Sequence, residues 1–222
     1  MNTQHQQRNP VLLVHGINDT GAVFNKMARY LRQEGWSVYT LDLLPNNGAG
    51  LLDQLAQQVA NYVSTNFEPK QPLDLLGFSM GGIVSRYYVQ RLGGIKKVQR
   101  FITISSPHQG TVVAYGSWLS GCVQMRPNSP LIKDLNSDVE MLKQLNFTSI
   151  WTPYDLMILP AKSSQMPIGK EVILPVALHP WMLKDSRTLA VVAKALAEPI
   201  NTYPQSGYVP NSQKSPLDSD NT

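Results

Sequence analysis

The chain has 222 residues, of which 42% are hydrophobic and 15% are charged. This length fits one domain with a substantial core, and the composition excludes both a disordered chain and a coiled coil. The formal net charge is +4, from 19 basic and 15 acidic residues. Because the basic residues are scattered and form no stripe, we expect no nucleic-acid partner.

A single cysteine, Cys122, excludes an intrachain disulfide and a cysteine-based zinc cluster. The first ten residues lack the apolar core of a signal peptide, and no apolar run reaches the roughly 18 residues of a membrane helix. We therefore expect a soluble, cytoplasmic protein without stable membrane insertion, with export of a processed form as the alternative.

Short apolar runs rich in β-forming residues alternate with helical patterns along the chain. The runs predict strands over residues 11–14, 37–43, 73–78, 100–105, 148–151 and 171–176. The helical spacing of apolar residues predicts helices over residues 23–31, 51–63, 80–92 and 187–196. Alternating strands and helices, with strands that are apolar almost throughout, predict an α/β fold with a mostly parallel central sheet and helices on both faces.

Two segments fall outside this alternation. Residues 110–146 contain no convincing strand and only a weak helical pattern, so we expect a small cap or connecting helices there. The end of the chain is rich in Pro, Ser, Asn and Asp. We therefore predict a single domain over residues 1–203 and a flexible polar tail over residues 204–222.

The most informative motif is Gly77-Phe78-Ser79-Met80-Gly81-Gly82, which matches G-x-S-x-G. It follows a predicted buried strand and opens a predicted helix, and its glycines permit a strained turn that raises Ser79 above the sheet edge. We predict Ser79 as a nucleophile, with Gly77 and Gly81 supporting the turn. The alternative is a phosphate-binding turn, which here lacks both the G-x-G-x-x-G spacing and a P-loop lysine.

A serine nucleophile needs a base, and in this arrangement the acid and then the histidine follow the serine along the chain. That order leaves His108 and His179. His179 follows the last predicted strand, where a base at the carboxyl edge of the sheet belongs, so we predict it as the base. For His108 we prefer a local structural role.

The acid orients the imidazole and stabilises its protonated form. Between the serine and His179 the aspartates are Asp134, Asp138 and Asp155. The first two lie in the predicted cap and have the pattern of surface charges. Asp155 follows a predicted strand, at the end where catalytic groups gather in open α/β sheets. We therefore predict Asp155 as the acid, and its alternative role is an Asx turn.

The tetrahedral oxyanion of acyl transfer needs fixed N–H donors. One is the N–H of Met80, after the nucleophile, and the other comes from the loop after the first strand, where Ile17 N–H is the natural donor. Gly16 lets this loop turn toward the serine. We expect the side chain of His15 to orient the loop by hydrogen bonding.

At these residues the chain resembles the α/β-hydrolase lipases and esterases, particularly the small bacterial triacylglycerol lipases. The matching stretches are Val14-His15-Gly16, Gly77 to Gly82, Ser106-Pro107-His108-Gln109-Gly110-Thr111, Tyr154-Asp155 and His179. The resemblance implies that Ser79, Asp155 and His179 form a catalytic triad. It also implies hydrolysis of a small-molecule carboxylic ester, such as an acyl-glycerol or similar lipid, through an acyl-enzyme. We expect no cofactor and no metal.

The larger bacterial lipases carry a long helical lid and often a calcium site. Residues 110–146 leave little room for such a lid, and no acidic cluster argues for calcium. Candidate apolar lining of an acyl pocket is Ile17, Phe24, Trp118, Leu119 and Met157. The same triad would serve a thioesterase, lactonase or amidase, and a non-catalytic binding protein of this fold would be expected to carry a damaged triad.

Overall fold

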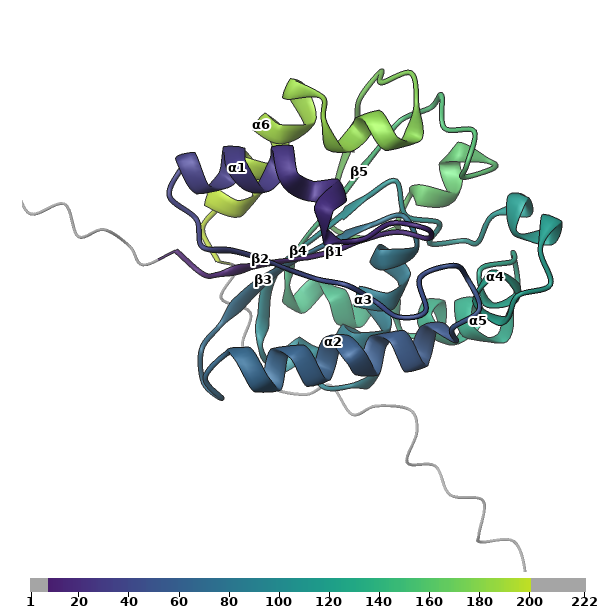
Figure 1. Cartoon of the computed structure of the whole chain (residues 1–222), viewed down its shortest axis with the longest axis horizontal. Helices are drawn as coiled ribbons and strands as arrows, with labels where there is room; N and C mark the ends of the chain where they lie inside the picture. The colour runs from purple at the N-terminus through teal and green to yellow at the C-terminus, as the bar shows by residue number, and fades with distance from the viewer. Residues whose placement is uncertain (1–7, 201–222) are drawn as a thin grey trace, which may run out of the picture.

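The computed structural model describes residues 8–200, and Figure 1 shows a central sheet between two layers of helices. The six strands pair in the order β2-β1-β3-β4-β5-β6, and every pair is parallel. They are β1 (Val11–Val14), β2 (Val38–Leu41), β3 (Leu73–Phe78), β4 (Val98–Ile104), β5 (Asn146–Trp151) and β6 (Lys170–Ile173). The predicted α/β fold is confirmed.

Helices cover both faces of the sheet. The α-helices are α1 (Asn25–Gln33), α2 (Leu52–Asn66), α3 (Met80–Arg91), α4 (Ser120–Gln124), α5 (Pro130–Ser137) and α6 (Ser186–Ala197). Helices α1 and α6 lie on one face, and α2 and α3 lie on the other (Figure 1). Two buried apolar clusters fill the layers between the sheet and the helices, which explains why the inner strands are apolar on both sides.

Strands β1 and β3 follow the sequence prediction more closely than the edge strand β6 does. Strands β1 and β3 have the predicted ends, whereas the strand expected over residues 171–176 ends at Ile173. Leu174 and Val176 are buried nonetheless, because they pack against the core from the loop that leaves the sheet. At this edge of the sheet, residues can therefore be buried without pairing in a strand. An apolar run in the sequence predicts that its residues are buried, but not that they belong to the sheet.

Of residues 110–146, all but the last fold outside the sheet, and Asn146 begins β5. Besides α4 and α5 they form two 3₁₀ helices, η3 (Val112–Gly116) and η4 (Val139–Gln144), before β5 begins. The segment is tied to the body: Gly121 N–H donates to Gly48 O at 2.9 Å, and Gln124 Oε1 accepts from Leu52 N–H at 2.6 Å. These bonds fix α4 against the chain that precedes α2.

The remaining short helices are η1 (Gly21–Phe24), η2 (Gly94–Lys96), η5 (Ala161–Ser164) and η6 (His179–Leu183). The tail predicted over residues 204–222 lies outside the described residues. Within residues 8–200, no helix is long and apolar enough to cross a membrane. That same part of the chain contains no group of three or more His, Cys, Asp or Glu side chains placed to hold a metal ion.

Candidate active site

Ser79 lies in a strained turn between β3 and α3. Its backbone has φ 54° and ψ −124°, a positive φ that a residue with a Cβ rarely adopts. The turn is tight: a Cβ on Gly77 would lie 2.5 Å from Gly82 Cα, and one on Gly81 would lie 2.2 Å from Val14 O. Only glycine fits at these two positions, so the sequence G-x-S-x-G is required by the geometry of this turn.

Asp155 and His179 come together at the carboxyl edge of the sheet. Nδ1 of His179 is 2.7 Å from Oδ2 of Asp155, and both side chains are buried. The other oxygen, Oδ1 of Asp155, accepts from the N–H groups of Met157 and Ile158, each at 2.9 Å. The carboxylate therefore makes a local turn and faces the imidazole at the same time, and the two interpretations of Asp155 are compatible.

The imidazole of His179 also lies beside the elbow. Its ring packs against the ring of Phe78, the residue before Ser79, with 4.7 Å between centroids. Ser79 Oγ makes no hydrogen bond to any residue in the described part of the chain. Hydrogen bonds between nucleophile and base are commonly long without substrate and shorten in the substrate complex.

Two backbone N–H groups near Ser79 are available to a ligand. The N–H groups of Ile17 and Met80 donate to no acceptor within residues 8–200. The Met80 N–H stands at the start of α3, where the helix dipole favours negative charge. Donors of this kind can stabilise an oxyanion that forms on a bound carbonyl.

The ring of His15 holds the loop that carries Ile17. It is fully buried, and its Nε2 accepts from Leu43 N–H at 2.8 Å. Its Nδ1 is therefore the protonated nitrogen, and it donates to Gly16 O at 2.8 Å. Both ring nitrogens are used, so His15 links the loop after β1 to the chain after β2.

The other candidate residues lie elsewhere. His108 is fully buried, its Nε2 is 3.0 Å from Thr103 Oγ1, and burial holds the pKa of its imidazole well below 6.5. Asp134 and Asp138 pair with Arg91 at 2.8 and 2.7 Å. The structure thus places these three side chains in packing and surface contacts, separate from the pair formed by Asp155 and His179.

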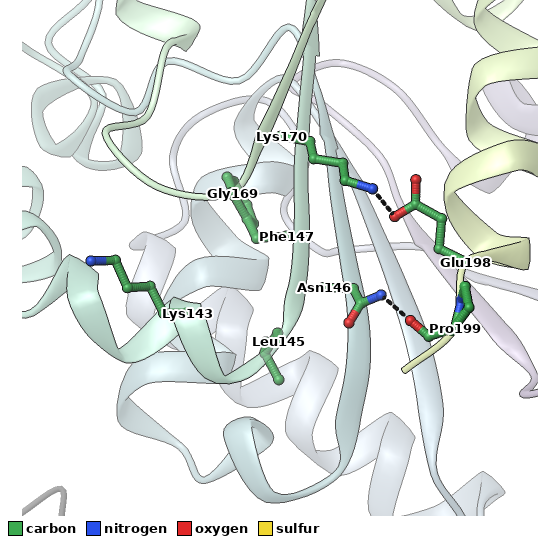
Figure 2. A pocket seen from close by; sticks show the side chains of 8 residues that line it. All are labelled: Lys143, Leu145, Asn146, Phe147, Gly169, Lys170, Glu198 and Pro199. Carbon is green, nitrogen blue, oxygen red and sulfur yellow. Dashed lines mark hydrogen bonds and ion pairs between the residues drawn. The ribbon is translucent and has the colours of Figure 1, made fainter. Parts of the chain in front are cut away.

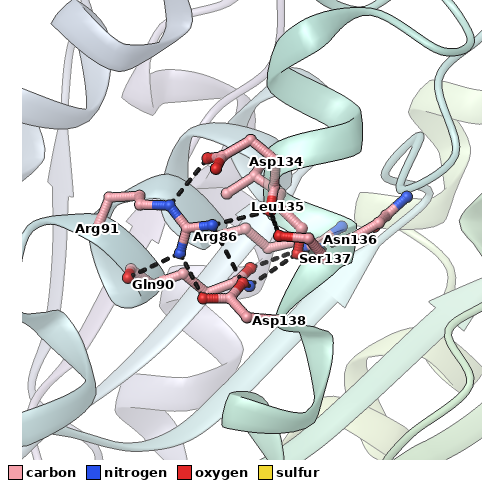
Figure 3. A network of polar contacts seen from close by, with 8 residues as sticks. All are labelled: Arg86, Gln90, Arg91, Asp134, Leu135, Asn136, Ser137 and Asp138. Atoms are coloured by element: carbon pink, nitrogen blue, oxygen red, sulfur yellow. Dashed lines mark hydrogen bonds and ion pairs between the residues drawn. The ribbon is translucent and has the colours of Figure 1, made fainter. Parts of the chain in front are cut away.

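A buried guanidinium links the nucleophile helix to α5, and sequence reasoning missed it. Figure 3 shows Arg86 of α3 among the residues at the end of α5. Its Nη2 donates to Leu135 O at 2.7 Å and to Asn136 Oδ1 at 3.0 Å, and its Nε donates to Gln90 Oε1 at 3.0 Å. Full burial lowers the pKa of Arg86 to about 9. Its only sequence signal is an arginine that lies among mostly apolar residues of a predicted core helix.

The expected apolar lining is divided in the structure. Phe24 is completely buried in the core under α1, so its assignment to a pocket was wrong. Ile17 is half-buried against the other core cluster. Trp118 is 87% exposed, and Leu119 and Met157 are 42% and 47% exposed. Further exposed apolar side chains lie next to the candidate acid and base, namely Leu156, Leu178 and Trp181.

A hollow of about 480 Å³ lies at the opposite edge of the sheet (Figure 2). It is lined by residues at the start of β5 and the end of the described chain, among them Asn146 and Pro199, and Lys170 pairs there with Glu198 at 2.6 Å. Because ligands of open parallel sheets bind at the carboxyl ends of the strands, this hollow is separate from the site around Ser79.

The fold and the elbow together define a serine hydrolase of the α/β-hydrolase type. The sequence model of the family described as palmitoyl protein thioesterase matches residues 10–125, just over half of the chain. The chain therefore belongs to the palmitoyl protein thioesterase family. The matched part contains the loop after β1 and Ser79, and it ends before Asp155 and His179.

Solved structures of hydrolases share the fold. Lipase B of Aspergillus fumigatus superimposes with a TM-score of 0.72 at 18% identity, over 87% of this chain and 53% of the lipase. The mature lipase BlEst2 of Bacillus licheniformis gives 0.66 at 18% identity, over 88% and 96% of the two chains. A pyrethroid hydrolase of Sphingobium faniae gives 0.60 at 16% identity, over 86% and 98%. This chain spans about half the length of the fungal lipase.

Proposed function

We propose that the protein hydrolyses acyl esters through an acyl-enzyme formed on Ser79, with Asp155 and His179 as the other members of the triad. The observation that carries this proposal is the strained Ser79 turn at the start of α3, at the same sheet edge as a hydrogen-bonded Asp155–His179 pair. A local turn needs no such pairing, whereas a nucleophile needs a base held by a third group.

In the proposed reaction Ser79 Oγ attacks the acyl carbonyl and His179 accepts its proton. The N–H groups of Ile17 and Met80 bind the oxyanion, and the charge of Asp155 stabilises the protonated imidazole. His179 then protonates the departing group, and water repeats the attack on the acyl-enzyme. The exposed apolar side chains beside Asp155 and His179 favour an apolar acyl group over a charged one.

Two leaving groups are candidates. The structural neighbours named as lipases favour an oxygen ester, such as an acyl-glycerol, whereas the family match favours a thioester. The chemistry differs when the leaving group departs. A thiolate, whose conjugate thiol has a pKa of about 8–9, is a better leaving group than an alkoxide. Hydrolysis of a thioester therefore depends less on proton donation by His179.

The experiment is hydrolysis of an oxygen ester and a thioester with the same octanoyl group and the same leaving skeleton. Dividing each kcat/KM by the rate with hydroxide corrects for intrinsic reactivity, and the larger quotient identifies the preferred class. Ser79→Ala should lower both rates by a factor on the order of 10⁴ or more. Near-normal turnover by this variant would overturn the proposal.

A fluorophosphonate probe gives a second readout that needs no knowledge of the substrate. Wild-type protein should be labelled at Ser79, and Ser79→Ala should not be labelled. Ser137→Ala is a matched control, because Ser137 is an exposed serine at the end of α5. A wild-type protein that stays unlabelled would favour a non-catalytic binding protein of this fold.

A further inference from the structure

A second carboxylate lies beside the nucleophile, and the proposed mechanism does not use it. A Cβ on Gly16 would lie 3.0 Å from Ser79 Cβ and 3.3 Å from Asp19 Oδ2. Since both distances start from the same point, the Asp19 oxygen is at most 6.3 Å, their sum, from Ser79 Cβ. An acyl group bound on Ser79 therefore reacts within a few ångströms of this carboxylate.

The backbone of Asp19 is held in place from outside its own loop. Asn46 Nδ2 donates to Asp19 O at 2.7 Å, and Asn18 N–H donates to Asn46 O at 2.8 Å. The loop is closed on itself by a bond from Asp19 N–H to Gly16 O at 3.4 Å. These contacts fix the backbone that carries the carboxylate relative to the candidate oxyanion loop.

The carboxylate itself has an unused capacity to accept hydrogen bonds. In residues 8–200 the Asp19 side chain makes no hydrogen bond and no ion pair, and it is half-buried. Its ionisable neighbours are His15 and His179, and partial burial raises its pKa above 3.8. Both nitrogens of His15 are already bonded, and Nδ1 of His179 faces Asp155. A ligand donor would therefore find a free acceptor in Asp19.

The neighbourhood of His179 indicates which part of a substrate meets Asp19. In the proposed reaction His179 delivers a proton to the departing group, so groups close to both Ser79 and His179 lie on the leaving-group side. We propose that Asp19 is a specificity-determining residue that binds a hydrogen-bond donor or a positive charge on the leaving group next to the scissile bond. This inference rests on the proposed acyl-ester hydrolysis.

The chemical class that fits comprises esters whose alcohol or thiol part carries a hydroxyl, an amide N–H or an ammonium group. Such a donor would be bound by the free oxygen, and an ammonium group would also gain from the negative charge. A leaving group that carries its own carboxylate or phosphate would be repelled. For esters that share one acyl chain, kcat/KM should therefore be highest with a cationic leaving group, lower with a neutral one and lowest with an anionic one.

The test uses four butanoyl esters, whose alcohols are choline, ethylene glycol, propanol and 3-hydroxypropanoate, at pH 7.5 and low salt. The measured quantity is the ratio of kcat/KM for wild type to that for Asp19→Asn, taken separately for each ester, which cancels intrinsic reactivity. We expect the ratio for the choline ester to exceed that for the propyl ester by about tenfold, and the ratio for the anionic ester to fall below it. The glycol ester should be preferred over the propyl ester, because its hydroxyl can donate to Asp19. Asp19→Asn keeps an acceptor oxygen, whereas Asp19→Leu removes it and should also abolish this preference.

The control is Glu34→Gln, which removes one exposed negative charge at the end of α1 and should leave all four ratios equal. A measurement on wild type alone keeps the test valid if the Asp19 variants do not fold: raising the salt concentration to 0.5 M should reduce the preference for the choline ester over the anionic ester. Equal ratios for the four esters, or a preference that salt does not change, would overturn the role of Asp19. Failure of the proposed function looks different, because wild type would then hydrolyse none of the four esters.

Discussion

One oxygen of the Asp155 carboxylate holds a local turn, and the other faces His179. Replacing a single oxygen by an NH₂ group tests the second contact without removing the first. In Asp155→Asn, Oδ1 can still accept from Met157 and Ile158, so the local turn is retained. The new NH₂ group, however, faces Nδ1 of His179 and favours the imidazole tautomer that cannot accept the serine proton. We expect kcat to fall by a factor on the order of 10⁴ with little change in the unfolding midpoint.

Asp185→Asn is the matched control for that prediction. Asp185 caps α6 through the N–H of Arg187, and its hydrogen bonds with Arg187 lower its pKa to about 2. Asparagine is an equally good cap residue, and the ion pair that it loses with Arg187 is partly exposed. Activity should therefore stay close to wild type, and stability should fall by about 1 kcal/mol or less. Equal activity of Asp155→Asn and Asp185→Asn would contradict the role proposed for Asp155.

The buried imidazole of His108 links stability to pH. Burial and the nearby charge of Arg86 hold its pKa in the folded protein well below 6.5. The unfolded chain therefore binds a proton below pH 6.5 that the folded chain does not, so this group contributes stability that is present above pH 6.5 and is lost as the pH falls. The loss is at most about 1.4 kcal/mol per pH unit.

The measurement is the free energy of urea unfolding at pH 7.5, 6.0 and 5.0 for wild type and His108→Gln. Glutamine carries both a donor and an acceptor for Thr103 Oγ1 and removes the titrating group. Because the carboxylates are common to both proteins, the difference between the two curves reports His108. Wild type should be the more stable protein at pH 7.5, and the difference should shrink as the pH falls. Parallel curves would show that His108 is not the source.

At the scale of elements, the contact between α3 and α5 rests on Arg86 more than on Arg91. In Arg86→Met, Leu135 O, Asn136 Oδ1 and Gln90 Oε1 lose a buried donor. We expect the free energy of unfolding to fall by about 2–4 kcal/mol. Arg91→Met, on the same helix, removes ion pairs with more exposed partners and should cost about 1 kcal/mol or less. Equal losses for the two variants would contradict this assignment.

Features that follow from burial on both faces or from steric necessity could be predicted from the sequence, and contacts between distant loops could not. The apolar runs of β1 and β3 define their ends because both strands are buried on both faces. The glycines around Ser79 signal the elbow because no Cβ fits there. Asp19, by contrast, gains its place from Asn46, 27 residues away. No local pattern encodes that contact, so the second carboxylate emerged only from the structure.

At the scale of the whole molecule, the triad candidates come from three loops at one edge of the sheet. The parallel order β1-β3-β4-β5-β6 brings the elbow after β3, the loop after β5 and the loop after β6 to the same edge (Figure 1). The candidate oxyanion loop after β1 lies at this edge as well. His179 follows β6 at that edge and begins η6. The segment 110–146 passes beside these loops, since Thr111 Oγ1 accepts from Leu159 N–H at 2.9 Å.

This attachment predicts the kinetics with aggregating substrates. A lid that opens at a lipid surface must detach from the body, whereas residues 110–146 are bonded to it through Thr111, Gly121, Gln124 and the Arg86 contacts with α5. These bonds come from three different parts of the fold, so opening would break several of them together. We therefore expect the rate with a butanoyl ester to follow one saturation curve, with no jump where the substrate begins to aggregate. A several-fold rise in rate at that concentration would show that the segment opens as a lid.

The same measurement on Gln124→Ala, which loses the hydrogen bond to Leu52, provides a second test. If this bond holds a lid closed, the variant should show the rise in rate at a lower substrate concentration than wild type. If the segment is fixed, the variant should follow the same single saturation curve.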